Sequence, residues 1–436
     1  SEEREIRGRC RETGSFRVPA MFGFERSWFG LPLLLLCCLV GCQENQRSPW
    51  DRTSDTLCGN GEGKAVWEVA TDKAPWAART GHGSVSFQDK VYVMGGRAEN
   101  GGLLSDMWES SDAKDWTLSG ITSGWTGRHR FGVVNLNNKI WILGGIMQGA
   151  SSKPEVSNEV WSLSSSGTEW DQIGVQSKAA SNTTNATAPT VSGTGAPMWA
   201  PRHSPIALVF QSRLWIMAGV RSLTEASAAQ TSDFTHDIWS TGDGVNWRRD
   251  VESAPWKGRR TAVGAMYQLQ MYVLAESADF RYYYNVWGTR DGINWSEPPA
   301  ACAVSGQRIA QALVIQSGLV VIGAVDGLEG GNVSGSMWYS PPSGNFNGTF
   351  LKSESAVATG ARLEASYMAF KGSIWQTGGF CPACAQGLKN MTFSDVQSSG
   401  PMIFPDISFG SASTLIAGRG LVSLLMMSFF LAFCSG

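Results

Sequence analysis

The sequence predicts an all-β chain folded as a six-bladed β-propeller, with the last blade closed by an N-terminal strand. Three observations carry this prediction: a composition rich in glycine and tryptophan, six imperfect copies of one aromatic pattern, and half a copy placed ahead of the first. The 436 residues include 51 Gly and 19 Trp, and 42% are hydrophobic, which is enough to build a core. Short β-branched runs separated by turn residues are typical of all-β folds.

Each copy of the pattern is anchored by an arginine, which in four copies follows a tryptophan by three positions. The arginines are Arg79, Arg128, Arg202, Arg259, Arg308 and Arg362. Sixteen residues later most copies carry a pair of small residues, such as Gly95-Gly96; the fourth copy has Ala275-Glu276 and the fifth has Gly323-Ala324 one position early. A second aromatic follows, at Trp108, Trp161, Trp239, Trp287, Trp338 and Phe393. A third stands eight or nine residues further on, at Trp116, Trp170, Trp247, Trp295 and Phe346.

The sixth copy has no third aromatic, and the start of the chain supplies one. Trp67 precedes Trp76 by nine residues, as Trp247 precedes Trp256. The segment 64–70 is therefore predicted to be the outer strand of the last blade. An internal repeat of this kind indicates a ring of similar units.

Every copy contains four strand-length runs with alternating polarity, joined by turn signals such as Asp243-Gly244. A four-stranded unit of this length is typical of a propeller blade. The predicted propeller spans 64–398, between linkers at 43–63 and 399–410. The predicted blades are 77–118, 125–172, 199–249, 256–297, 305–352, and 359–398 together with 64–70.

The glycine pairs and spaced tryptophans resemble the kelch repeat. Residues 64–398 are similar to a kelch-repeat propeller of the galactose-oxidase-like superfamily, more closely in blades one to three than in blades four to six. The resemblance implies ligand binding on the face that carries the arginines. It does not extend to the tyrosines and histidines that hold copper in galactose oxidase, because that set cannot be matched here.

Strand parity places the arginines and the small pairs on one face, together with the long connections 146–158, 175–198, 220–236 and 325–335. Function concentrates in long loops on a rigid scaffold. We therefore expect the six arginines to form a cationic rim that binds carboxylates. The alternative is that each arginine stabilises its own repeat, by stacking on tryptophan or bonding backbone carbonyls. Tyr283, within "DFRYYYNVW", is a further candidate for ligand stacking, or else belongs to the core.

The predicted function is a non-catalytic module that binds a protein, peptide or glycan on the arginine face. The alternative is an extracellular carbohydrate-active enzyme, sialidase-like or galactose-oxidase-like. No catalytic set, metal site or cofactor is predicted: three of the four histidines follow the repeat arginines, and Asp243 and Asp291 read as turn residues. With 35 basic against 37 acidic residues, no nucleic-acid partner is expected.

Both ends of the chain resemble targeting signals, which predict an extracellular, cell-surface protein. Residues 1–42 are interpreted as an upstream segment and a signal peptide beginning at Met21, although "LVGC" at 39–42 also resembles a bacterial lipoprotein box. Residues 411–436 are interpreted as a lipid-anchor (GPI) signal with attachment at Gly410, or else as a short hydrophobic tail. Sequons for glycosylation stand at Asn182, Asn185, Asn294, Asn332, Asn347 and Asn390.

Outside the terminal signals four cysteines remain. Cys381 and Cys384, in "CPAC", are predicted to form a disulfide in the sixth blade, as suits a secreted chain. Cys58 and Cys302 are then left as a possible pair by elimination only.

Overall fold

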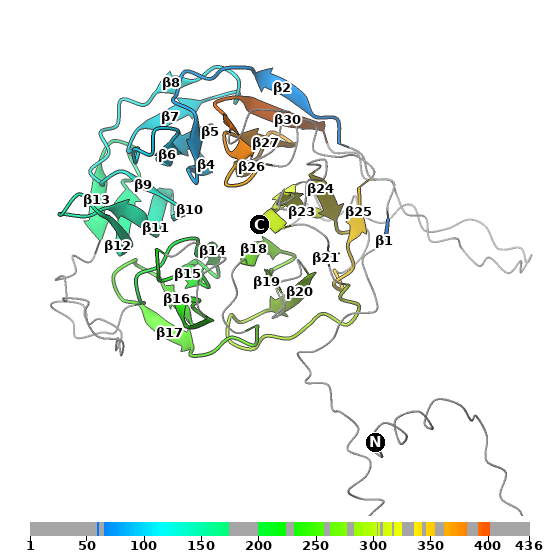
Figure 1. Ribbon diagram of the computed structural model, residues 1–436. Helices are drawn as coiled ribbons and strands as arrows, with labels where there is room; N and C mark the ends of the chain where they lie inside the picture. The colour runs from blue at the N-terminus through cyan, green and yellow to red at the C-terminus, as the bar shows by residue number, and fades with distance from the viewer. Residues whose placement is uncertain are drawn as a thin grey trace, which may run out of the picture. The chain divides into compact units, whose positions relative to one another are not determined.

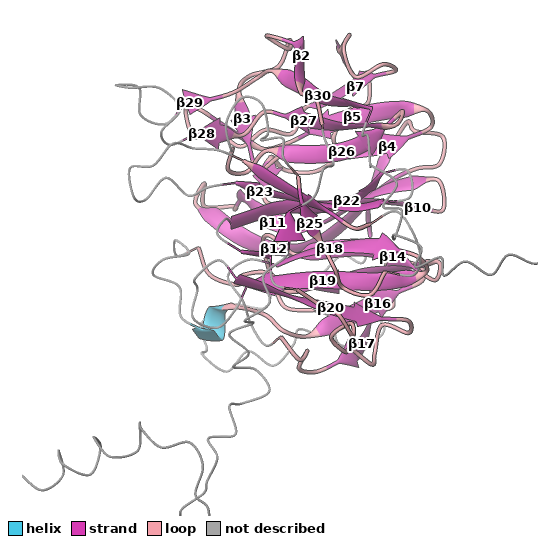
Figure 2. Ribbon diagram, turned by 90° about the vertical axis from the view of Figure 1, so that its right-hand side faces the viewer, coloured by secondary structure: helices cyan, strands magenta, loops and turns pink. Residues whose placement is uncertain are grey.

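The structure is a computed structural model that describes residues 59–60, 65–173, 199–223, 231–256, 262–276, 283–302, 304–305, 308–315, 318–324, 335–341, 346–353, 362–381 and 391–401. Six sheets stand around a central axis (Figure 1), which confirms the six-bladed propeller. Seen from the side, the inner strands run between the two faces of the ring (Figure 2).

Each blade is an antiparallel sheet whose strands follow one another from the axis outward. The first three blades contain β4 (Gly83–Phe87), β5 (Lys90–Met94), β7 (Met107–Ser110) and β8 (Thr117–Leu118); β10 (Gly132–Leu136), β11 (Lys139–Gln148), β12 (Pro154–Leu163) and β13 (Trp170–Ile173); and β14 (Ile206–Phe210), β15 (Arg213–Met217), β16 (Ile238–Thr241) and β17 (Arg248–Val251). The other three contain β18 (Ala262–Tyr267), β19 (Gln270–Glu276), β20 (Tyr283–Thr289) and β21 (Val304–Ser305); β22 (Arg308–Ile315), β23 (Gly318–Ala324), β24 (Ser336–Tyr339) and β25 (Leu351–Lys352); and β26 (Ser366–Phe370), β27 (Ser373–Thr377), β30 (Val396–Pro401) and β2 (Glu68–Thr71).

Shorter strands lie on the face where the repeat arginines begin each blade. They are β3 (Arg79–Thr80) with β6 (Arg97–Ala98), β9 (Arg128–His129) alongside β11, and β28 (Phe380–Cys381) with β29 (Met391–Thr392). Among the described residues, helical structure is limited to one 3₁₀ turn at Thr231–Asp233.

The predicted ring closure is confirmed. β2 pairs antiparallel with β30, with Val69 opposite Gln397, so strands from the two ends of the propeller share the sixth sheet. Trp67, just before β2, is 7% exposed and belongs to a core cluster with Tyr339 of blade five and Ile374 of blade six. The closing segment is thus held both by backbone pairing and by burial between blades.

Two strands lie where none was predicted. β1 (Gly59–Asn60), inside the predicted linker 43–63, pairs in parallel with β25 and gives blade five a fifth strand. In blade four, Ser296 makes only an isolated bridge to Gly288, and the outer strand is completed by β21, which lies across the predicted start of blade five at residue 305.

The position assigned to Phe393 was wrong by four residues. Trp161 lies opposite Ile142, two residues before the Gly144-Gly145 pair. In blade six the residue at the same register is Gln397, opposite Gln376. Phe393 instead lies against the Arg362 guanidinium, with Arg362 Cζ 3.8 Å from the centre of the phenyl ring.

Tryptophans and glycines explain why the blades pack so closely. The tryptophan before each of the first four blades meets a second tryptophan of that blade edge to face, for example Trp76 and Trp116 with ring centres 4.7 Å apart. In blades one to three the second tryptophan begins the fourth strand or directly precedes it, and in blade four it is Trp295, next to the bridge residue Ser296. Neighbouring inner strands touch at small residues: a Cβ on Gly132 would lie 2.7 Å from the Cβ of Ala207. Larger residues there would push adjacent blades apart.

Candidate functional site

The repeat arginines of blades one, two, three and six lie inside the blades. Arg79 is fully buried and donates hydrogen bonds to the Gly95 carbonyl at 2.9 Å and to both carboxylate oxygens of Asp106 at 2.7 Å. Asp106 also accepts the indole N–H of Trp108 at 2.7 Å. One guanidinium therefore joins the start of the blade to its second and third strands.

The same arrangement recurs in three other blades, with carbonyl bonds that each span sixteen residues. Arg128 donates to Gly144 O at 3.2 Å, Arg202 to Ala218 O at 3.1 Å and Arg362 to Gly378 O at 3.1 Å. Their ion-pair partners are Glu159, Asp237 and Asp395, and the three arginines are at most 1% exposed. The constant spacing of sixteen residues between the arginine and the small pair is therefore explained by this hydrogen bond from the guanidinium to the backbone carbonyl.

These contacts correct the expectation of a cationic rim at Arg79, Arg128, Arg202 and Arg362. The structure favours the alternative interpretation, in which each arginine serves its repeat. A sequence signal for it existed: an acidic residue precedes the second aromatic by two positions at Asp106, Glu159 and Asp237, and precedes Gln397 in the same way at Asp395. In blades four and five Asn285 and Ser336 stand there instead, so the acid is lost where the glycine pair is also lost.

The remaining predicted ligand-binding residues are only partly described. Arg259 lies outside the described residues. Arg308 begins β22 opposite Ala324, and Tyr283 begins β20 opposite Ser305; the structure describes the backbone but not the side chain of each.

A cavity of about 330 Å³ occupies the central channel on the arginine face. The innermost strand of every blade, or the residues just before it, contributes to its lining. Among these residues are His82, Arg130, His203, Gln311 and Glu364. All six blades thus converge on one small polar space, which is the best candidate for a binding site.

The mouth of this channel is built on an unusual backbone position, two residues after the repeat arginine. Gly81, Arg130, Ser204 and Glu364 occupy it in four blades, with φ of 60°, 55°, 51° and 55°. Blades one, two and three each hydrogen-bond to the blade before them at this position: Gly81 N–H to Glu364 O at 2.8 Å, Arg130 N–H to Gly81 O at 2.7 Å, and Ser204 N–H to Arg130 O at 2.7 Å. Left-handed backbone costs non-glycine residues energy, and here the inter-blade bonds offset it.

Above Gly81 two charged side chains meet. The Arg130 guanidinium donates through Nε, at 2.9 Å, and through Nη2 to Oε1 of Glu364. A Cβ on Gly81 would lie 3.2 Å from Arg130 Cγ and 3.3 Å from Glu364 Oε2. The glycine therefore makes room for an ion pair that links blades two and six across blade one. The sequence prediction missed this pair, although the variability of this position among otherwise similar copies was visible.

Two histidines that line the mouth, His82 and His203, and a third, His129, next to Arg130 in the chain, are held neutral. Burial, and secondly the charge of Arg79, lower the pKa of His82 to about 3. Burial, and secondly the charge of Arg130, lower the pKa of His129 and of His203 to about 4. His82 Nε2 contacts Thr377 Oγ1 at 2.8 Å, and His203 Nε2 donates to Ser222 O at 3.0 Å. Within the described parts of the chain, no three histidine, cysteine or acidic residues gather as metal ligands would.

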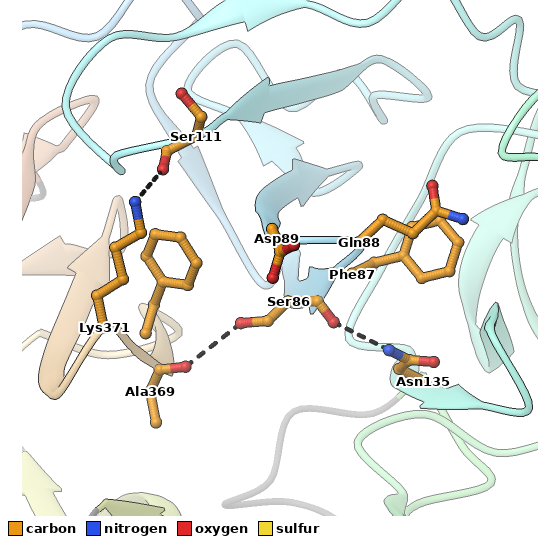
Figure 3. Close-up of a pocket in the computed structure, with 9 residues that line it drawn as sticks. Ser86, Phe87, Gln88, Asp89, Ser111, Asn135, Ala369 and Lys371 are labelled. Carbon is orange, nitrogen blue, oxygen red and sulfur yellow. Dashed lines mark hydrogen bonds between the residues drawn. The ribbon is translucent and has the colours of Figure 1, made fainter.

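A second, more open cavity of about 720 Å³ lies at the other end of β4, where the first and second strands of each blade turn (Figure 3). Ser86 and Lys371 lie on its walls, where Ser86 Oγ donates to Ala369 O at 3.3 Å and Lys371 Nζ donates to Ser111 O at 2.8 Å. It is lined by the turns of two blades and one residue of a third, whereas all six blades line the channel mouth.

Cys302 and Cys381 are both disulfide-bonded. The proposed partners Cys384 and Cys58 lie outside the described residues. Two sequon residues are described and exposed, Asn294 and Asn347. The sequons at Asn182, Asn185, Asn332 and Asn390, and the lipidation residue Gly410, lie outside the described residues. In the described portion no helix is long and apolar enough to cross a membrane.

Comparison with known proteins agrees with this architecture. The family model of the Kelch motif matches residues 78–109, which include Arg79, the glycine pair and Trp108. The solved structure of YjhT is similar with a TM-score of 0.50 and 14% identity, over 75% of this chain and 96% of that one. A sequence comparison with curated proteins finds no match. The fold is a six-bladed β-propeller, and within it the segment of blade one around Arg79 matches the Kelch motif. At this identity the likeness shows the fold alone.

Proposed function

We propose that the protein is a non-catalytic binding module that takes its ligand at the channel mouth on the arginine face. The observation that carries the proposal is the cavity of about 330 Å³ where all six blades meet around the Arg130–Glu364 pair. Arg130 and Glu364 are 29% and 18% exposed, so a ligand reaches them more readily than the fully buried repeat arginines.

Binding is favoured over hydrolysis by the acidic groups near the cavity. Glycosidases of the usual kind use two carboxylates on either side of the scissile bond. Among the described residues that line the mouth, Glu364 is the sole carboxylate. Asp243 holds a turn instead: its Oδ1 accepts the N–H groups of Val245 and Asn246 at 2.9 and 2.8 Å. Although burial raises its pKa, these bonds hold the pKa of Asp243 at about 2.

The experiment is to block the mouth. Gln311→Trp would fill the cavity from β22, and Ser111→Trp places the same bulk on an exposed turn of the opposite face. Both proteins are screened on glycan and peptide arrays after their melting temperatures are compared. We expect Gln311→Trp to abolish binding and Ser111→Trp to keep it. If Gln311→Trp fails to fold, Arg130→Gln, which adds no volume to the cavity, is tested in its place. Ligand binding that survives a blocked mouth contradicts the proposal.

We further propose that this module acts at the cell surface, held by a C-terminal lipid anchor or a short hydrophobic tail. The proposal rests on the signal-like ends of the sequence and on the two exposed sequon residues, Asn294 and Asn347. Surface labelling of intact cells tests the location, and release by a phosphoinositide-specific phospholipase tests the anchor. Protein found only inside cells, or without attached glycans, argues against it.

A further inference from the structure

We infer that the channel mouth takes a neutral polyhydroxyl ligand, a single sugar residue of a glycan, and not an acidic peptide. The inference rests on the proposed function, because it names the ligand class of that same site.

The first argument is charge balance. Among the described residues lining the cavity, the formal charges are those of Arg130 and Glu364, and they oppose each other in one ion pair. His82 and His203 are neutral at physiological pH, because burial lowers their pKa to about 3 and about 4. The four repeat arginines behind the wall whose side chains are described are each compensated by an acid; they are Arg79, Arg128, Arg202 and Arg362. The described mouth therefore offers no net positive charge to an anion.

The second argument is the mixture of donors and acceptors. Arg130 and the amide of Gln311 donate, and Glu364 accepts; Ser84 and Ser366, whose hydroxyl oxygens are 2.6 Å apart, do both. A sugar hydroxyl is donor and acceptor at once, so neighbouring hydroxyls can satisfy this alternating set. A peptide carboxylate only accepts, and it would be repelled by Glu364.

The third argument is shape. The volume of about 330 Å³ is at the lower end for ligand sites and suits one sugar ring better than an extended peptide. Phe131, Val133, Ile206 and Val263 give the wall apolar surface for the C–H faces of such a ring.

The test is calorimetric titration of the full chain. The probes are galactose, glucose, mannose and N-acetylglucosamine on one side, and a sialylated sugar and a glutamate-rich peptide on the other. We expect at least one neutral sugar to bind, with a Kd that changes less than about twofold between 50 and 500 mM NaCl, because an uncharged ligand is not screened. Glu364→Gln should weaken it about tenfold or more, since bonds to a charged acceptor are the strong ones.

Glu99→Gln is the matched control: it lies on an exposed loop of the same face and does not line the cavity. Glu99→Gln should leave the Kd unchanged. If Glu364→Gln melts at a lower temperature than the natural protein, Arg130→Gln is used in its place. Binding of the acidic peptide or sialylated sugar alone, with a Kd that rises more than about tenfold with salt, overturns the inference while the binding site stands. Absence of binding by every neutral sugar also overturns it. Sugar binding that persists in Gln311→Trp overturns the proposed function itself.

Discussion

Replacing Arg79 by methionine separates a structural arginine from a ligand-binding one. The substitution keeps an unbranched side chain but removes the bonds to Gly95 O at 2.9 Å and to both oxygens of Asp106 at 2.7 Å. Removing one member of a fully buried ion pair costs about 3–5 kcal/mol. Asp106 is 29% exposed and keeps its bond to Trp108, so water and the indole relieve part of the penalty. We therefore expect a loss of about 3 kcal/mol in the free energy of unfolding.

Urea unfolding, followed by tryptophan fluorescence, measures this loss. Arg97→Met is the control, because Arg97 is exposed on the same face, and it should stay within about 0.5 kcal/mol of the natural protein. Asp106→Asn removes the stranded charge, so the double variant should lose less than the sum of the single losses. If Arg79→Met unfolds like the natural protein but loses ligand binding, the assignment of these arginines to the fold is refuted.

Three more predictions follow from described residues. Trp67→Ala should destabilise the propeller by about 3–5 kcal/mol, because Trp67, 7% exposed, is buried in the core beside the closing strand. Val69→Ala, at a position 51% exposed, is the control and should change the free energy of unfolding little. Equal urea midpoints for the two variants would argue against the closure. Leu269→Asn should stabilise by about 1 kcal/mol, because Leu269 is 82% exposed with φ of 59° and asparagine tolerates that conformation; a lower midpoint would contradict this. Stability should fall as the pH drops from 6.5 towards 4. Burial lowers the pKa of native His129 and His203 to about 4, so over this range the unfolded chain takes up protons that the native protein does not. His203→Gln should make the fall in stability shallower, and a urea midpoint that stays constant over this range would contradict the prediction.

The fold could be predicted because its determinants repeat. Six copies of the arginine and aromatic pattern predict six blades, and the position of Trp67 nine residues before Trp76 predicts the closure. Elements without a repeated signal could not be predicted. β1 is two residues long and is specified by the strand it joins, β25. Gln397 was missed because a polar residue fills an aromatic position, where it still donates to Asp395 at 2.9 Å, as Trp108 does to Asp106.

The candidate site could not be predicted from the repeats, and the reason lies in its backbone. Two residues after the repeat arginine, the N–H groups of Gly81, Arg130 and Ser204 each donate to a carbonyl of the preceding blade. Because the main chain alone makes these bonds, the side chain at this position is free to differ: the six copies carry Gly, Arg, Ser, Thr, Ala and Glu. A residue that recurs in the copies contributes to the folding of each copy, because folding is what all copies have in common. Residues that differ between copies, such as Arg130 and Glu364, can meet at one point on the axis and give a symmetric scaffold an asymmetric binding site.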